Sequence, residues 1–141
     1  MAGHPLEGVL VLVVEDDDDT REMMSCLLEE SGAVVTSAGC VSEAFAVFVG
    51  QKPNVVVSDI GLPGKSGYEL VSRIRSLPAQ LGRDTPIIAV SAQAEYTRRR
   101  VAPAHDFTAY VNKPFEVAAL LGAVCEQAGR CEARVAAKPR L

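Results

Sequence analysis

Residues that can bind a metal ion or a phosphoryl group follow four of the five apolar runs in this chain. They are two adjacent acids, a third acid, a hydroxyl and an amine: Glu15 and Asp16, Asp59, Ser91, and Lys113. Carboxylates bind Mg²⁺ and can attack phosphorus, while a hydroxyl and an ammonium group bind phosphoryl oxygens. If the runs are parallel strands, their carboxyl ends share one edge of a sheet, and these side chains meet there.

The segments around these residues predict a parallel sheet covered by helices. The apolar runs are short, rich in Val and Ile, and not alternating, which is typical of strands buried on both faces. Segments with helical periodicity lie between them. The alternation of strand and helix, repeated five times, predicts an α/β fold with helices on both faces of the sheet.

Apolar stripes define four clear helices and a weak one. The stripes are Met23, Met24, Leu27 and Leu28; Val41, Ala44, Phe45 and Phe48; Leu70, Val71, Ile74 and Leu77; and Val117, Leu120, Leu121, Val124 and Cys125. The weak helix, over residues 95–105, contains Pro103, which removes a backbone hydrogen bond and clashes one turn earlier.

Five consecutive acids, from Glu15 to Asp19, follow the first run directly. Adjacent carboxylates repel one another, and a divalent cation relieves that repulsion. We assign Glu15 and Asp16, at the end of the strand, to a cation site. Asp18 and Asp19 are more typical of a solvated helix start, which Asp19 or Thr20 can cap.

Asp59 follows the third run and precedes a loop, residues 60–67, that contains three glycines and a proline. A carboxylate at the end of a strand can attack phosphorus and form an acyl phosphate. Alone, Asp59 would more simply be a turn or capping residue. Its expected proximity to Glu15 and Asp16 favours the chemical role, and the Gly61 carbonyl can add a third protein ligand for Mg²⁺.

Ser91 and Lys113 follow the last two runs. Ser91 can donate a hydrogen bond to a phosphoryl oxygen, and Lys113 can pair with a carboxylate or a phosphate. Each residue alone could be an ordinary strand-end serine or a solvated lysine. Their order along the chain and their place at strand ends, together with the three acids, indicate one site.

The composition excludes several classes of protein. A chain of 141 residues with 48% hydrophobic residues suits one globular domain. The net charge of −4 argues against nucleic acid or an anionic membrane as a partner, and no apolar stretch reaches the roughly 20 residues of a membrane helix. We see no export signal, so we expect a cytoplasmic protein whose four cysteines are free thiols.

Four motifs together resemble the receiver domain of response regulators in bacterial two-component signalling. They are VLVVEDD at 11–17, SDIGLPGKSGYEL at 58–70, PIIAVSA at 86–92 and AYVNKPF at 109–115. The resemblance covers about residues 8–126, and this segment is similar to the chemotaxis regulators of the family. It implies a flavodoxin-like, doubly wound (βα)5 fold whose five-stranded parallel sheet has the order 2-1-3-4-5.

The resemblance implies a phosphorelay role. Asp59 matches the phosphoacceptor, and with Glu15, Asp16 and the Gly61 carbonyl it would hold Mg²⁺. The phosphoryl donor would be a histidine kinase or a histidine phosphotransfer protein. The chain would not be an enzyme beyond its own phosphorylation and slow autodephosphorylation.

The resemblance also implies a switch. Lys113 matches the site lysine, Ser91 the switch hydroxyl, and Tyr110 the aromatic residue that turns inward on activation. A downstream protein would bind the face formed by the fourth helix, fifth strand and fifth helix. The run Arg98–Arg100 near that face is as compatible with a solvated helix as with a partner contact.

Three alternatives stay open. The pattern Asp16-x-Asp18-x-Thr20 fits a phosphatase of the haloacid dehalogenase type, with Asp16 as the nucleophile, but that class needs a late acidic pair that is not found after Lys113. An interaction module with the same fold and no phosphorylation is the second. A receiver domain excised from a hybrid histidine kinase is the third.

We expect a leader at residues 1–7, a receiver domain at 8–126 and a tail at 127–141. Met1 lies shortly before the first strand, which favours a stand-alone receiver over the excised domain.

Overall fold

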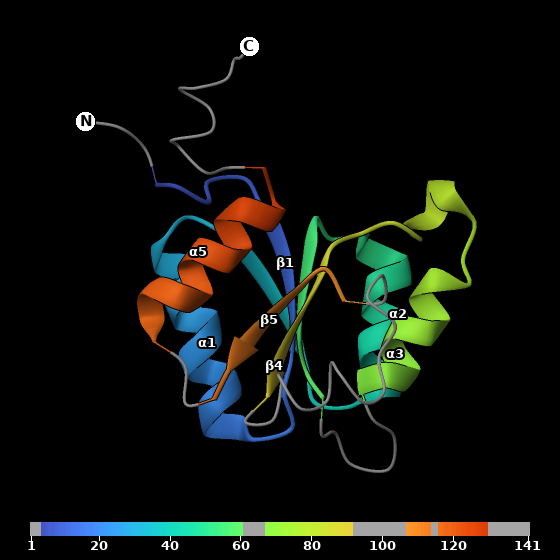
Figure 1. Ribbon diagram of the computed structural model, residues 1–141, viewed down its shortest axis with the longest axis horizontal. Helices are drawn as coiled ribbons and strands as arrows, with labels where there is room; N and C mark the ends of the chain where they lie inside the picture. Colours follow the sequence, from blue (N-terminus) through green and yellow to red (C-terminus); the bar gives the residue numbers. More distant parts are fainter. Residues whose placement is uncertain (1–3, 61–66, 92–106, 114–115, 130–141) are drawn as a thin grey trace.

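The structure, a computed structural model, describes residues 4–60, 67–91, 107–113 and 116–129. Its elements are β1 (Leu10–Val14), α1 (Asp18–Glu30), β2 (Val34–Ala38), α2 (Val41–Gln51), β3 (Val55–Asp59), α3 (Gly67–Arg75), the 3-10 helix η1 (Ala79–Leu81), β4 (Ile87–Ser91), β5 (Ala109–Asn112) and α5 (Val117–Gln127). The strands form one parallel sheet in the order β2-β1-β3-β4-β5 (Figure 1). The predicted α/β, flavodoxin-like fold and its strand order are confirmed.

The sheet separates two apolar cores. Helices α1 and α5 cover one face, and α2 and α3 cover the other (Figure 1). Alternate residues of β1 enter opposite cores, with Val11 and Val13 facing α1 and α5, and Leu12 and Val14 facing α2 and α3. All four side chains are fully buried. A strand buried on both faces has no solvated side, which explains why its sequence does not alternate.

The register of the strands aligns their carboxyl ends. Val14 pairs with Ser58, and Asp59 in turn pairs with Val90. Ser91 then pairs with Asn112 in the edge strand β5. Because all strands run in one direction, the residues that follow them emerge at the same edge of the sheet. Strand β2 and strand β5 are the two outermost strands of the sheet. The apolar run that forms β2 is followed by no residue for phosphate or metal chemistry.

The N-terminal turn packs against the domain. Leu6, which the prediction places in the leader, is fully buried in the same core as Val9, and its backbone N–H donates to the Ser31 carbonyl at 2.8 Å. Gly32 makes this approach possible, because a Cβ there would lie 2.6 Å from the Cβ of His4. The turn therefore covers the end of α1, and the domain boundary at residue 8 stays a prediction.

Helix α1 begins earlier than predicted. Asp17 is its N-cap, and the Asp17 carboxylate accepts hydrogen bonds from the backbone N–H and the hydroxyl of Thr20, at 2.8 and 2.6 Å. The prediction that Asp19 or Thr20 caps the helix is wrong. A capping carboxylate reaches the N–H three residues later, and Asp17 is extended and placed to do so, whereas Asp19 already lies in the first turn. The assignment of Asp18 and Asp19 to the helix start is confirmed.

Helices α1 and α5 contact the sheet through rows narrower than their predicted stripes. Met24 and Leu28 of α1 are fully buried, but Met23 is 48% exposed. Leu120 of α5 is fully buried, while Val117, in the first turn, is 46% exposed. In both helices the buried residues are four apart, Met24 and Leu28 in α1 and Leu120 and Val124 in α5, so the stripe members beside that row keep contact with solvent.

Several sequence predictions fall outside the described residues. These include the weak helix over 95–105 with Pro103 and Arg98–Arg100. Within the part of the chain that the structure describes, Cys26 and Cys40 form no disulfide bond, which agrees with the prediction of free thiols. None of the described helices has the length and apolar character needed to cross a membrane.

Lys52 gives a test of backbone strain in this fold. It ends α2 in the left-handed conformation with φ of 53°, while its N–H donates to the Phe48 carbonyl at 2.8 Å. A non-glycine residue there costs about 1–2 kcal/mol, partly offset by the greater unfolded-state entropy of glycine. Lys52→Gly should raise the free energy of unfolding by about 0.5–1 kcal/mol in urea denaturation. Lys52→Ala keeps the strain, and an equal gain in this control would contradict the explanation.

Candidate functional site

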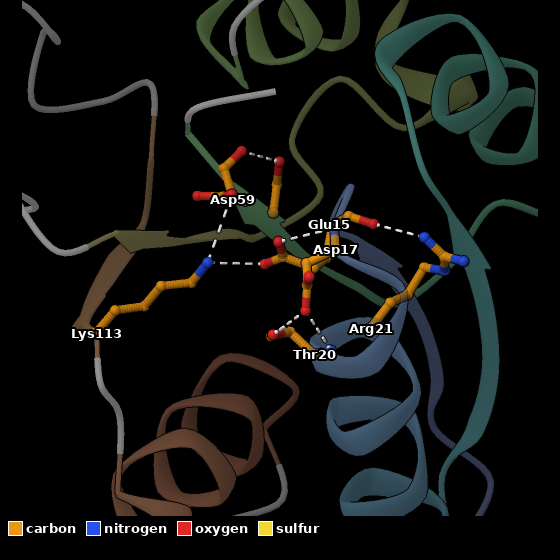
Figure 2. A network of polar contacts seen from close by, with 7 residues as sticks. Glu15, Asp17, Thr20, Arg21, Asp59 and Lys113 are labelled. Atoms are coloured by element: carbon orange, nitrogen blue, oxygen red, sulfur yellow. Dashed lines mark hydrogen bonds and ion pairs between the residues drawn. The ribbon is translucent and has the colours of Figure 1, made fainter. Parts of the chain in front are cut away.

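Three acids and an amine meet at the carboxyl edge of the sheet. Glu15 and Asp16 follow β1, Asp59 ends β3, and Lys113 follows β5 (Figure 2). One carboxylate oxygen from each acid lies within 4.8 Å of the others. The Lys113 Nζ lies 2.9 Å from Glu15 Oε1 and 3.5 Å from Asp59 Oδ2. The predicted convergence of these four residues is present in the structure.

Burial strengthens the repulsion among the three carboxylates and shifts the pKa values of Glu15 and Lys113. Glu15 is only 2% exposed, and burial, together with the nearby charge of Asp59, raises its pKa despite the hydrogen bond from Lys113. Burial would lower the pKa of Lys113, but the hydrogen bond to Glu15 and the charges of Asp59 and Glu15 outweigh it and raise that pKa. The acids therefore repel one another, and Lys113 offsets part of that repulsion.

The donor set fits a magnesium ion. Mg²⁺ prefers oxygen ligands and is commonly held by one or two carboxylates with waters and phosphate. Glu15, Asp16 and Asp59 supply closely spaced carboxylate oxygens, and a divalent cation would remove their mutual repulsion. Gly61, whose carbonyl is predicted to be a further ligand, lies outside the described residues.

The other acids of the run have different partners. Asp17 caps α1, and its hydrogen bonds from Thr20 lower its pKa. The Asp18 carboxylate forms an ion pair with Arg21 at 2.6 Å. The phosphatase hypothesis needs Asp16 and Asp18 to act together, but among the described residues Asp18 does not join the carboxylate cluster.

The backbone of Asp59 is tightly enclosed. The Ser58 hydroxyl donates to the Asp59 carbonyl at 2.9 Å, and the Gly67 N–H donates to the Ile60 carbonyl at 2.7 Å. A Cβ at Gly67 would lie 2.6 Å from the Asp59 carbonyl oxygen. Helix α3 can therefore begin beside Asp59 only because residue 67 has no side chain. The glycines and the proline of residues 60–67 predict a loop that includes Gly67, but they do not predict this contact.

Of the two predicted switch residues, the structure describes the side chain of Tyr110 but not that of Ser91. Ser91 ends β4 next to Asn112 of β5, but its side chain lies outside the described part of the structure. The Tyr110 ring is partly buried against Phe107, with ring centroids 5.6 Å apart, and Phe107 in turn contacts Tyr68 at 5.5 Å. Tyr110 thus belongs to a chain of three aromatic rings that reaches helix α3.

Glu15 gives a pH-dependent prediction. In the absence of Mg²⁺, the wild type's free energy of unfolding relative to Glu15→Gln should fall as the pH rises from 4.5 through the raised pKa of Glu15. In that window the native state binds more protons than the unfolded state, so its stability declines with pH. Urea denaturation at several pH values measures the difference. If the stability of the wild type relative to Glu15→Gln grows with pH instead, Lys113 lowers the pKa of Glu15 by more than burial raises it.

Gly67 gives a steric prediction. Gly67→Ala should lower the free energy of unfolding by about 1–3 kcal/mol, because the new methyl group must displace the Asp59 backbone. Gly122→Ala is the matched control, since a Cβ at Gly122 meets nothing within 4 Å and alanine favours the helix. Thermal or urea denaturation measures both. Equal stability of the two variants would show that the backbone at Asp59 and residue 67 can move apart at no cost in free energy.

Comparisons with known proteins agree with this geometry. An uncharacterized 14.6 kDa protein of Leptolyngbya boryana is 38% identical over 106 residues, which cover 75% of this chain and 79% of that protein. The phosphate regulon transcriptional regulatory protein PhoB of Pseudomonas aeruginosa is 34% identical over 127 residues, which cover 88% of this chain. The aligned part is 55% of PhoB, so the chain matches about half the length of that regulator.

A solved structure has both the fold and the metal. The receiver domain of the sensor histidine kinase PA1611 from Pseudomonas aeruginosa superposes with a TM-score of 0.77 and 27% identity, covering 91% of this chain and 99% of that domain. That structure holds a magnesium ion coordinated in its active-site cleft. The family model of the response regulator receiver domain matches residues 11–125. This chain therefore belongs to the response regulator receiver domain family of two-component signalling systems.

Proposed function

We propose that this receiver domain accepts a phosphoryl group on Asp59 and thereby switches a protein-binding face. The observation that carries the proposal is the cluster of Glu15, Asp16 and Asp59 with Lys113 bonded to two of its members. Asp59 ends a central strand and has neighbours that can neutralise charge on an incoming group. The proposed domain spans residues 8–126.

The reaction proposed is transfer from phosphohistidine of a histidine kinase or phosphotransfer protein. An Asp59 carboxylate oxygen attacks phosphorus in line, a P–O bond forms, and the P–N bond breaks with its electron pair returning to the imidazole. Lys113 pairs with the transferred group's oxygens. A bound Mg²⁺, held by Glu15, Asp16, Asp59 and the Gly61 carbonyl, would supply further charge neutralisation.

The conformational part of the proposal concerns Ser91 and Tyr110. The Ser91 hydroxyl would bond the new phosphoryl group, and Tyr110 would follow it inward and bias a two-state equilibrium. Tyr110 supports this role because its ring already contacts Phe107 and so connects β5 to the core beneath α3. The output would be contact with a downstream protein at the face that includes β5 and α5. Catalysis would be limited to self-phosphorylation and slow autodephosphorylation.

A receiver that belongs to a hybrid histidine kinase is the second candidate. The likeness to the PA1611 receiver, which is part of a sensor histidine kinase, favours it. The chemistry proposed for Asp59 is the same in either case.

Acetyl phosphate with Mg²⁺, followed by intact-mass measurement, tests the proposal. Wild type should gain a base-labile phosphoryl adduct, which Asp59→Asn should abolish and Asp16→Asn should strongly reduce, since that variant loses a metal ligand. Asp84→Asn is the matched control, because Asp84 is 80% exposed and pairs with Arg83 before β4, at the opposite edge of the sheet.

Two outcomes would contradict the proposal. An adduct that survives Asp59→Asn and disappears in Asp16→Asn would make Asp16 the nucleophile. The absence of an adduct in every form, also with a phosphorylated histidine donor, would favour an interaction module that is not phosphorylated.

A further inference from the structure

Arg21 lies beside the carboxylate cluster without joining it. It is one turn into α1, and its side chain is 25% exposed. Its Nη1 donates to the backbone carbonyl of Glu15 at 2.9 Å, and its Nη2 pairs with Asp18 Oδ1 at 2.6 Å. Figure 2 shows Arg21 and Lys113 on opposite sides of Glu15. Lys113 therefore binds the Glu15 side chain, while Arg21 binds its main chain.

The carbonyl that Arg21 holds belongs to the peptide bond between Glu15 and Asp16. A peptide unit is planar, so fixing its oxygen also fixes the direction in which the Asp16 Cα follows. The Glu15 N–H is held as well, because it donates to the Ala38 carbonyl at 3.0 Å. Asp16 is exposed, so the place of its carboxylate depends on the backbone that carries it. Arg21 thus constrains the segment that presents two of the three acids.

The loop after β2 leaves room for the guanidinium group. A Cβ at Gly39 would lie 3.3 Å from Arg21 Nη1 and 4.0 Å from the Glu15 carbonyl oxygen. The φ angle of Gly39 is not in the left-handed region, so the absence of a side chain, and not backbone freedom, is what matters there. Asp16, Asp18, Arg21 and Gly39 line one polar groove beside the cluster.

We propose that Arg21 is a positioning residue for the magnesium site, where its guanidinium fork fixes the Glu15–Asp16 peptide and joins it to the first turn of α1. The fork is suited to this task because its donors have a fixed planar geometry and reach two acceptors at once. The inference rests on the proposed function, since it concerns the metal site of that function.

Charge and position predict opposite effects of removing Arg21. Arg21 is a cation beside a cation site, so if it acted through charge alone, its removal would strengthen Mg²⁺ binding. If it fixes the peptide, its removal weakens binding, because groups that orient metal ligands change affinity by about 10–100-fold. The direction of the change therefore separates the two roles.

The experiment titrates MgCl₂ into the folded protein and measures Kd by calorimetry or by NMR shifts. Arg21→Met should raise Kd about tenfold, at the lower end of the range for such groups. Arg21→Lys keeps the charge but reaches one acceptor, and it should give an intermediate Kd. Unfolding temperatures are measured in parallel.

Arg75→Met is the matched control. Arg75 also donates to two backbone carbonyls, those of Arg83 at 2.6 Å and Thr85 at 2.8 Å, but before β4, at the opposite edge of the sheet. Its loss should lower the unfolding temperature and leave the Kd for Mg²⁺ unchanged. A general loss of stability is thereby separated from a loss of positioning.

A Kd for Arg21→Met equal to or below the wild-type value would overturn the proposal. If Arg21→Met does not fold, Gly39→Val decides, since its side chain displaces the guanidinium group while Arg21 remains. A weaker Kd in that variant supports the proposal, and an unchanged Kd refutes it. Wild type that binds no Mg²⁺, or an unaltered Kd in Asp59→Asn, would instead refute the proposed metal site and this inference with it.

Discussion

The crowding of three carboxylates at one edge of the sheet is the constraint that organises this molecule. Glu15, Asp16 and Asp59 have oxygens within 4.8 Å of one another, and Glu15 is almost fully buried. Such a group is unfavourable without nearby positive charge. Lys113 supplies that charge at the side chains, and Arg21 stabilises the adjoining main chain. The two apolar cores on either side of the sheet keep the strand ends in place.

The close spacing of these charges also explains how a phosphoryl group on Asp59 would act on the proposed switch. Lys113 bonds both Glu15 and Asp59, so a phosphoryl group on Asp59 would compete for its ammonium group and change the charge balance of the whole cluster. Tyr110 lies on the strand that precedes Lys113, and its ring contacts Phe107 in the core. A complete reversal of a two-state equilibrium from 1:99 to 99:1 needs roughly 5.5 kcal/mol of difference in interaction free energy between the two states.

The sequence was a good guide to what depends on local pattern. Buried strands, helical stripes and the residues at strand ends follow from periodicity, and the fold and the convergence of Glu15, Asp59 and Lys113 could be predicted. It was a poor guide where several local solutions compete. In a run of five acids any of the later ones could cap the helix, and only the path of the chain after β1 selects Asp17. The burial of Leu6 beside α1 likewise did not follow from any local pattern of residues.

The sequence by itself therefore determined the parallel α/β architecture, through the period of its apolar residues, and the chemical types that gather at one edge. Only the tertiary structure decided which atoms meet. Lys113 and Glu15 are 98 positions apart, and their 2.9 Å contact depends on the register of β3 and β4, the two strands that lie between β1 and β5 in the sheet. The contacts of Arg21 with the Glu15 carbonyl and of Gly67 with the Asp59 backbone likewise depend on distance in space. Such contacts involve backbone atoms, which every residue has, so no pattern of side-chain types could reveal them.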